Sequence, residues 1–316
     1  MSTVQTMRAI SQDVLGGPEV LKVVERERPS PRPNEILVRV RAAGVNPTDW
    51  KHRENGGFLG KPPFVLGWDV SGVVEEVGIG VARFRPGDEV FGMLPYPYGH
   101  GSHAEYVTGP ARAFALKPAV IDHVQGGALP LVSLTAWQAL VETAGLQEGQ
   151  RVLVHAAAGG VGHVAVQIAK ARGAHVIGTA SEGKHELLRT LGADELIDYR
   201  SADFAEVAKD VDVVLDTIGG DYSLRSLRVL RPGGIVVSIL PVGSAEFYEE
   251  AQRLGVRAVR MLVDASHSGM RAIAGLIEQG ALRATIAETF PLAEAAEAHR
   301  LGGTGRTAGK LVLLGE

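Results

Sequence analysis

Residues 151–162 read RVLVHAAAGGVG, so an apolar run leads directly into a glycine-rich segment. The run at 151–155 has the length and composition of a buried strand. The residues that follow place apolar side chains at the spacing of one helix face: Val161, Ala165, Ile168 and Ala169. A strand, a glycine turn and a helix in this order are typical of a dinucleotide-binding fold. There the backbone approaches a pyrophosphate, and N–H groups at the start of the helix bind its charge.

The spacing within this turn differs from the commonest dinucleotide-binding pattern. It reads Ala-x-x-Gly-x-x-Gly, whereas the common pattern is Gly-x-Gly-x-x-Gly. A glycine cluster alone also marks a purely structural turn, but the strand before it and the helix after it favour a cofactor site. We therefore predict that the pyrophosphate contacts Ala158, Gly159, Gly160, Val161 and Gly162.

Apolar runs of strand length recur after the turn, at 175–179, 195–198, 212–216, 235–239 and 259–263. Segments with helical spacing separate them, for example at 184–191 and 222–230. Near-continuous apolar strands that alternate with helices predict a parallel sheet covered on both faces. Together with the run at 151–155, six strands match a doubly wound nucleotide-binding sheet.

The first third of the chain has a different pattern, in which apolar and charged residues alternate at 35–41. A second strand is predicted at 70–77, and short strands separated by Gly and Pro indicate a compact β-barrel-like domain. The chain ends with an apolar strand at 309–314, which needs a sheet to join, and the N-terminal domain is the expected host. We therefore predict one domain of 1–127 and 266–316, and a dinucleotide-binding domain of 128–265 inserted into it.

The composition excludes several classes of protein. The 316 residues include no cysteine, which rules out disulfides, thiolate zinc sites, iron–sulfur clusters and cysteine nucleophiles. A formal net charge of -4 gives no reason to expect nucleic acid as the main partner. No apolar run approaches the roughly 18 residues of a membrane span, and the first residues do not resemble a signal peptide. We expect a cytoplasmic location.

The choice between NAD and NADP depends on the end of the second predicted strand. An NAD site usually has Asp or Glu about 20 residues past the glycines. Here residues 178–184 read GTASEGK, in which Thr179 is neutral and Ser181 and Lys184 could bind a 2′-phosphate. Tyr199 ends the next strand and could approach the same place. Lys184 as a solvated helix residue is the plainer interpretation, and Glu182 keeps NAD open, but we favour NADPH.

Several segments occur in an order known from one superfamily. They are 16–21 (GGPEVL), 43–50 (AGVNPTDW), 134–137 (LTAW) and 156–162 (AAAGGVG). Taken together they resemble the medium-chain dehydrogenase/reductase superfamily, and within it the quinone oxidoreductase (zeta-crystallin-like) branch, over nearly the whole chain. The resemblance implies a GroES-like β-barrel domain completed by the C-terminus, with an inserted Rossmann domain.

Departures from the superfamily concern zinc. Its zinc alcohol dehydrogenases carry a cysteine where Asn46 stands, and Gly-His-Glu where residues 67–69 read GWD. Their four-cysteine lobe has no counterpart in this chain. Without a metal no Lewis acid polarises an alkoxide, so alcohol oxidation by their route is disfavoured. Some relatives have a tyrosine after the Asn-Pro-x-Asp segment, whereas residues 50–52 here read WKH, so that proton donor cannot be transferred.

The resemblance also implies roles for single residues. Asn46 and Asp49 would lie at the nicotinamide end of the cleft, where Asn46 could donate a hydrogen bond to the substrate. A turn residue before proline and a helix cap are the alternatives for these two. The residues implied at the nicotinamide or along the cofactor edge are Thr135, Thr217, Leu240, Val263 and Arg306.

A loop at 94–103 completes the implied cleft. It holds Tyr96, Tyr98, His100 and His103. Its histidine pair makes a poor metal site, because no third ligand is apparent. We expect this loop to line the cleft or to lie on the surface.

These observations lead to one main hypothesis and two alternatives. We expect an NADPH-dependent oxidoreductase that transfers hydride to a quinone without zinc. An enone or enoyl reductase needs the same cofactor site, and a non-catalytic NADPH-binding protein, sensory or RNA-binding, is the third possibility. The expected partner is a small molecule, with neither nucleic acid nor membrane. Pairing of edge strands at 259–263 would make a homodimer.

Overall fold

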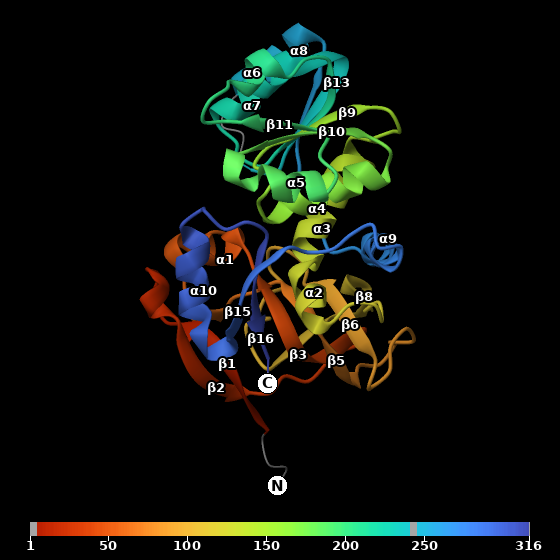
Figure 1. Ribbon diagram of the computed structural model, residues 1–316. Coiled ribbons are helices and arrows are strands. Elements are labelled where there is room, and N and C mark those ends of the chain that lie inside the picture. Colours follow the sequence, from red (N-terminus) through yellow and green to blue (C-terminus); the bar gives the residue numbers. More distant parts are fainter. Residues whose placement is uncertain (1–4, 241–244, 316) are drawn as a thin grey trace. The chain divides into compact units, whose positions relative to one another are not determined.

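The computed structural model describes residues 5–240 and 245–315. Within them the chain forms two compact units. Unit 1 extends to Leu131 and also includes Asp264–Glu278 and the residues from Arg283 onward, while unit 2 comprises Val132–Val263 and Gln279–Leu282. Figure 1 colours the chain by sequence, and unit 1 accordingly contains both the red and the deep blue segments. The chain therefore leaves unit 1 to form most of unit 2, returns at Asp264, and contributes the short segment Gln279–Leu282 to unit 2 before its last part completes unit 1.

Unit 2 is built on a six-stranded parallel sheet of order β11-β10-β9-β12-β13-β14. Its strands are β9 (Arg151–Val154), β10 (His175–Ala180), β11 (Glu195–Asp198), β12 (Val211–Asp216), β13 (Leu230–Ser238) and β14 (Arg257–Arg260). The first strand, β9, lies in the interior of the sheet, and the chain winds outward from it in both directions. This is the doubly wound arrangement that the alternating strands and helices predicted.

Helices cover both faces of this sheet. They are α4 (Gly160–Ala171), α5 (His185–Thr190), α6 (Phe204–Val207), α7 (Asp221–Ser226) and α8 (Ala245–Leu254). In Figure 1, α6, α7 and α8 lie on one face and α4 and α5 on the other. The core under α6 and α8 joins Leu153 and Val236 of the sheet to Phe204 and Phe247 of the helices. Strands buried on both faces explain why the sequence shows continuous apolar runs.

The sixth strand differs from the prediction. We placed it at 259–263, but it spans Arg257–Arg260. Its register with β13 ends at the pair Ser238 and Arg260. The N–H of Met261 still donates to the carbonyl oxygen of Ser238 at 2.9 Å, but β13 ends there, and Leu262 and Val263 lie outside the strand. The edge strand therefore carries an arginine at each end, and the homodimer that we derived from an apolar edge stays a prediction.

Unit 1 is mainly β-structure. Its strands are β1 (Thr6–Gln12), β2 (Lys22–Glu27), β3 (Glu35–Val45), β4 (Phe64–Val65), β5 (Asp69–Val77), β6 (Glu89–Met93), β7 (Tyr106–Pro110), β8 (Phe114–Leu116), β15 (Ile286–Pro291) and β16 (Lys310–Leu314). They form a three-stranded sheet, β2-β1-β4, and a seven-stranded sheet, β15-β16-β3-β5-β6-β8 with β7 paired to β3. Strands β3 and β5 contain the segments predicted at 35–41 and 70–77.

The C-terminal strand completes unit 1, as expected. β16 pairs antiparallel with β3, and Leu311 lies opposite Val45. This pairing brings the start of β16 beside the end of β3, and so next to the start of α1 (Pro47–Asn55), the helix that follows β3. The other helices of the unit are α2 (His123–Ala128), α9 (His267–Glu278) and α10 (Ala295–Gly303), and α3 (Pro130–Trp137) follows α2. Within residues 5–240 and 245–315, no helix combines the length and apolar character needed to cross a membrane.

Candidate functional site

The glycine turn of unit 2 is held by its neighbouring strand. It connects β9 to α4, and Gly159 is the N-cap of that helix. The N–H of Ala156 donates to Thr179 Oγ1 at 3.1 Å, and the N–H of Ala157 donates to the carbonyl oxygen of Thr179 at 2.9 Å. Ala156 has a φ of +45°, a left-handed conformation that is uncommon for alanine. The end of β10 thus holds the turn in place through two hydrogen bonds, a few residues before α4 begins.

Close packing explains why this turn needs glycine. A Cβ on Gly162 would lie 2.7 Å from both Cα and O of Ala157, which are backbone atoms that cannot move aside cheaply. Gly159, Gly160 and Val161 are partly exposed, whereas Ala158 and Gly162 are buried. The first N–H groups of a helix have no partner within it, and the helix dipole adds positive potential there. The predicted phosphate-binding residues therefore offer backbone N–H groups suited to an anion, and their contact with a pyrophosphate stays a prediction.

Most of the other predicted cofactor residues lie at the same edge of the sheet, because parallel strands all end there. Ser181 and Lys184 follow β10, Tyr199 follows β11, Thr217 follows β12, Leu240 follows β13 and Val263 follows β14. Ala180 pairs with Asp198, so residues 181 and 199 leave the sheet side by side. Ser181 and Lys184 are partly exposed and Tyr199 is exposed. These three side chains are placed where a ligand on the turn would extend.

Other predicted cofactor residues are placed differently. Thr179 is buried and its hydroxyl accepts from the turn, while Thr217 Oγ1 donates to the carbonyl oxygen of His155 at 2.7 Å. The hydroxyl groups of both threonines therefore bond to backbone groups of the protein itself at this edge of the sheet. Thr135 is a buried residue of α3, and Arg306 is an exposed residue of unit 1 that follows α10. Their predicted cofactor contacts stay predictions.

Two buried polar groups that the sequence analysis missed stabilise this edge. His155 contacts Ser226 Oγ through Nε2 at 2.9 Å, and burial lowers its pKa to about 4, so the ring is neutral. Asp216 accepts hydrogen bonds from the N–H groups of Ile218 and Gly219, each at 2.9 Å, and from the hydroxyl of Ser238 at 3.0 Å. Asp216 ends β12 and His155 follows β9, and a polar residue after an apolar run was the available signal.

In unit 1, Asn46 lies in a buried polar cluster with Asp69 and Lys310. Asn46 Nδ2 donates to Asp69 Oδ2 at 2.8 Å, and the Lys310 ammonium donates to Asn46 Oδ1. The same ammonium lies 3.3 Å from Asp69 Oδ2, and the side chains of Lys310 and Asp69 are 2% and 0% exposed. Both ends of the Asn46 amide are thus fixed by charged partners. Neither of these two partners was predicted from the sequence to belong to the site.

Asp49 acts as a cap in this structure. Its Oδ2 accepts from the N–H of Asn46 at 2.6 Å at the start of α1, which is the alternative that we left open for it. Among the described residues its Oδ1 has no hydrogen-bond partner although it is buried. Burial raises the pKa of Asp49 to about 8, so the carboxyl group is mostly protonated at neutral pH.

The loop at 94–103 presents its four aromatic and histidine side chains in different ways. Tyr96 is half-buried, whereas Tyr98 is 75% exposed. His100 Nδ1 donates to the carbonyl oxygen of Val65 at 2.6 Å. His103 is fully buried, and burial lowers its pKa to about 4. Within residues 5–240 and 245–315, no three His, Cys, Asp or Glu side chains gather as a metal site.

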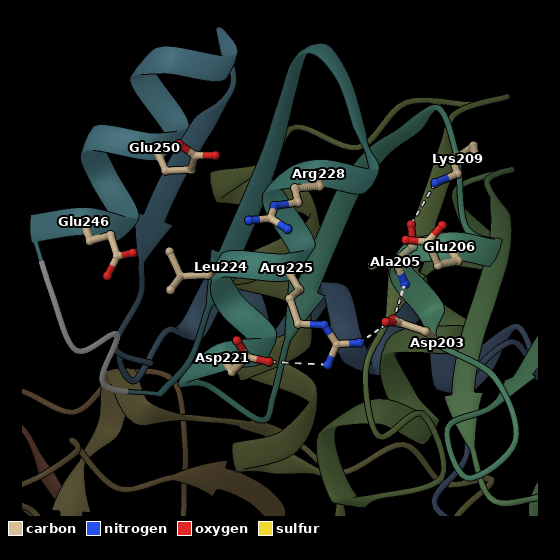
Figure 2. Close-up of a pocket in the computed structure, with 10 residues that line it drawn as sticks. All are labelled: Asp203, Ala205, Glu206, Lys209, Asp221, Leu224, Arg225, Arg228, Glu246 and Glu250. Atoms are coloured by element: carbon tan, nitrogen blue, oxygen red, sulfur yellow. Dashed lines mark hydrogen bonds and ion pairs between the residues drawn. The ribbon is translucent and has the colours of Figure 1, made fainter.

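Figure 2 shows a cavity of about 670 Å³ in unit 2, lined by residues of α6, α7 and α8 and their neighbours. Its central group is Arg225, which bridges Asp203 and Asp221 and lies 4.7 Å from the ring centroid of Phe204. None of the predicted site residues lines this cavity. Acidic and basic side chains pair within this cavity. The cavity is therefore charged, and it is separate from the predicted phosphate site.

Comparisons with known proteins agree with this architecture. The family model of the alcohol dehydrogenase GroES-like domain matches residues 32–119, and that of the zinc-binding dehydrogenase matches residues 191–313. The chain is 36% identical to 2-haloacrylate reductase of Burkholderia sp, over 95% of this chain and 96% of the relative. It is 33% identical to human quinone oxidoreductase, over 98% of each chain. The solved Escherichia coli quinone oxidoreductase complexed with NADPH aligns with a TM-score of 0.89 at 30% identity, covering 98% of this chain and 100% of the other.

One matching family model is named for zinc, but the residues that stand where zinc alcohol dehydrogenases carry their ligands do not fit this metal. Oxygen atoms of Asn46 and Asp69 both contact the Lys310 ammonium, which places a positive charge where a cation would bind. Trp68 stands where zinc enzymes have histidine, and its ring nitrogen carries a hydrogen that it donates to Pro97 at 3.2 Å. An indole N–H offers no lone pair to a metal. Asn46, Trp68 and Asp69 therefore do not offer a zinc site.

The family is established by whole-length similarity and by the site. A relative that is 33% identical covers almost the entire chain, and the two family models match parts of both units. The solved Escherichia coli structure aligns over 98% of this chain, so the match extends over both the β-rich unit and the unit with the parallel sheet. The chain therefore belongs to the medium-chain dehydrogenase/reductase family, in its quinone oxidoreductase branch, and is an NAD(P)H-dependent oxidoreductase.

Proposed function

We propose that this protein is an NADPH-dependent reductase that transfers hydride to a quinone without zinc. The observation that carries the cofactor choice is the end of β10, where Thr179 and Ala180 are neutral and the first acidic residue, Glu182, comes two positions later. Ser181 and Lys184 follow directly, and a lysine there favours a phosphate over a hydroxyl. The NADPH complex of the Escherichia coli relative supports the same choice.

The chain's own residues would bind and orient the two reactants. The backbone of Gly159, Gly160 and Val161 would hold the pyrophosphate, and Ser181 with Lys184 would hold the 2′-phosphate. When bound, the reduced nicotinamide supplies hydride. A quinone accepts hydride readily without a metal, so what remains for the protein is to exclude water and to offer hydrogen-bond donors to the substrate oxygen. Asn46 stays a predicted donor, although its Nδ2 already donates to Asp69.

An enone or activated-alkene reductase is the second candidate. The similarity to a protein named 2-haloacrylate reductase favours it, because an acrylate is an alkene conjugated to a carboxyl group. Both reactions need the same cofactor site. The two reactions differ in the acceptor, which is the variable of the assay that follows.

Steady-state oxidation of NADPH by the purified full-length chain tests the proposal. The acceptors would be 1,4-benzoquinones, α,β-unsaturated ketones, acrylates and thioesters, each with NADPH and with NADH. We expect turnover of quinones and a preference for NADPH. Turnover of enones or acrylates without quinones would establish the second candidate. Tight NADPH binding without oxidation by any acceptor would indicate a non-catalytic binding protein, for which RNA affinity would then be measured.

The proposal includes a cytoplasmic homodimer. β14 is the edge of the six-stranded sheet, and pairing of two such edges would satisfy their unpaired backbone groups. Sedimentation equilibrium of the purified chain would show a dimer if this is correct and a monomer if it is not.

A further inference from the structure

Three side chains of unit 1 form a chain of hydrogen bonds that the proposed function has not used. His52 Nδ1 lies 3.1 Å from Thr48 Oγ1, and Thr48 Oγ1 lies 3.0 Å from the hydroxyl of Tyr96. Thr48 and His52 are one turn apart on α1, directly after Asn46, whereas Tyr96 comes from the loop at 94–103. No other hydrogen bond of the Tyr96 hydroxyl is present among the described residues.

The tautomer of His52 sets the direction of this chain. Its Nδ1 lies 2.7 Å from the carbonyl oxygen of Thr48, and a carbonyl oxygen only accepts, so Nδ1 must carry the hydrogen. Burial lowers the pKa of His52, which keeps the ring neutral with Nε2 unprotonated. The same N–H points to Thr48 Oγ1, and a hydroxyl that accepts from it can donate its own hydrogen to Tyr96. The Tyr96 oxygen then accepts, and its own hydrogen remains available for another group.

The Tyr96 ring is held in place from several sides. Its centroid lies 5.3 Å from that of Trp68 and 6.1 Å from that of Phe58, both close to edge-on. Trp68 is fully buried and donates to the carbonyl oxygen of Pro97, the residue after Tyr96. The N–H of Leu94 donates to the carbonyl oxygen of Trp68 at 2.9 Å. The loop is thus attached to Trp68 on both sides of Tyr96, which limits the movement of the phenol.

The phenol is also protonated under working conditions. Partial burial raises the pKa of Tyr96 above its usual value, so it keeps its hydrogen at neutral and mildly alkaline pH. Tyr96 is nonetheless only half-buried, so part of the side chain is accessible to a ligand. A fixed, protonated hydroxyl on a partly exposed side chain, whose oxygen can accept a hydrogen bond from Thr48, is suited to donate to a carbonyl oxygen of a substrate.

We propose that Tyr96 is a catalytic residue that donates a hydrogen bond to the substrate oxygen on which negative charge develops, and that Thr48 is its positioning residue. This inference rests on the proposed function, since it needs a quinone or enone as substrate. The Thr48 hydroxyl orients the phenol hydrogen away from α1, and His52 orients Thr48. Asn46 need not be the donor, because its amide is held by a bond from Nδ2 to Asp69 and by a bond from Lys310 to Oδ1.

Tyr96→Phe, which removes one oxygen atom, is the direct test, with Tyr98→Phe as the matched control because Tyr98 is 75% exposed in the same loop. With saturating NADPH and duroquinone we expect Tyr96→Phe to lower kcat by a factor of about 100, the order found for the loss of one oxyanion donor. NADPH affinity, followed by fluorescence, should not change. Tyr98→Phe should match the wild type. Unchanged kcat in Tyr96→Phe, or an equal loss in Tyr98→Phe, overturns the assignment.

The role of Thr48 is tested by a pair of variants. Thr48→Val removes the hydroxyl with little change of shape, whereas Thr48→Ser retains it. We expect kcat to fall about 10-fold in the valine variant, an order that corresponds to one hydrogen bond, and to stay near the wild-type value in the serine variant. Equal kcat values for the two variants would show that the hydroxyl does not position Tyr96.

A binding measurement separates this inference from the proposed function. Calorimetric titration of the NADP+ complex with duroquinone involves no turnover, and we expect Tyr96→Phe to weaken binding about 5-fold. If the wild type fails to oxidise NADPH yet binds duroquinone more tightly than the variant, the proposed function fails while the Tyr96 contact stands. If the wild type turns over quinones and the variant matches it in both kcat and affinity, only the Tyr96 inference fails. Absence of duroquinone binding by the wild type overturns both.

Discussion

Replacing Lys310 by methionine should destabilise unit 1 strongly. The Lys310 ammonium contacts Asp69 Oδ2 and the carbonyl oxygen of Val45, each at 3.3 Å, and also donates to Asn46 Oδ1. The side chain is 2% exposed, and that of Asp69 is 0% exposed. Methionine preserves much of the apolar stem but removes the charge, so Asp69 is left as a buried carboxylate without its cation.

The expected size follows from that burial. Removing one partner of a buried ion pair costs about 3–5 kcal/mol, because the remaining charge stays desolvated. Asp69 would keep hydrogen bonds from Asn46 Nδ2 and from the N–H of Leu131, which favours the lower end of this range. Even that end is a large part of the roughly 5–15 kcal/mol by which domains are usually stable.

Urea unfolding followed by tryptophan fluorescence measures the effect. Trp68 is fully buried and adjacent in sequence to Asp69, so it reports on this part of unit 1. The control is Lys22→Met, which removes a cation 3.9 Å from Asp13 in a pair whose side chains are 65% and 72% exposed. We expect that control to change the free energy of unfolding by less than about 1 kcal/mol.

Two results would refute the reasoning. One is a Lys310→Met variant no less stable than Lys22→Met. The other comes from the double variant Lys310→Met, Asp69→Asn, which removes the stranded charge and should be more stable than Lys310→Met alone. If the double variant loses as much free energy of unfolding as Lys310→Met and Asp69→Asn lose in sum, the two groups are not coupled. The buried pair is then not the cause.

Three further predictions concern the turn, the cofactor and pH. Gly162→Ala should lower NADPH affinity and cost about 1–3 kcal/mol of stability, because the new Cβ meets the backbone of the turn, whereas Gly183→Ala, with nothing within 4 Å, should be neutral in fluorescence titration and urea unfolding. Lys184→Ala should weaken NADPH binding about 10- to 100-fold and NADH binding little; equal losses in parallel titrations would contradict the 2′-phosphate assignment. Asp49 holds a proton in the folded state up to a pKa of about 8 that the unfolded chain releases near 3.8, so its contribution makes stability fall as pH rises between these values. The slope is about 1.4 kcal/mol per pH unit. In Asp49→Asn that slope should be absent when unfolding is compared at pH values across the window, and an unchanged pH dependence would exclude Asp49 as its source.

Local patterns were sufficient for the dinucleotide-binding unit. The strand at 151–155, the glycine turn and the helix after it are neighbours in sequence, and each has its own periodicity. Parallel strands end at one edge, so the positions of Ser181 and Tyr199 beside the turn followed from order alone. The sixth strand was misplaced because apolar residues continue past Arg260, and only the length of β13 ends the pairing.

Single site residues were harder to interpret, because a residue type does not show what its side chain contacts. Thr179 and Thr217 lie at the predicted edge, yet their hydroxyls bond to the chain itself. Asp49 was predicted near the substrate and caps α1. The two threonines lie at the predicted edge of the sheet, whereas a position of Asp49 near the substrate stays a prediction. The hydrogen-bond partners of all three residues could not be identified from the sequence pattern.

The sequence by itself determined the fold class, the glycine turn and the absence of cysteine ligands, because these depend on composition and on neighbours along the chain. Only the tertiary structure decided the contacts of unit 1. Lys310 meets Asn46 across 264 residues because β16 pairs with β3, and Tyr96 meets Thr48 across 48 residues because its loop is attached to Trp68. Such pairs are brought together by the closing of sheets and loops, for which no local periodicity exists.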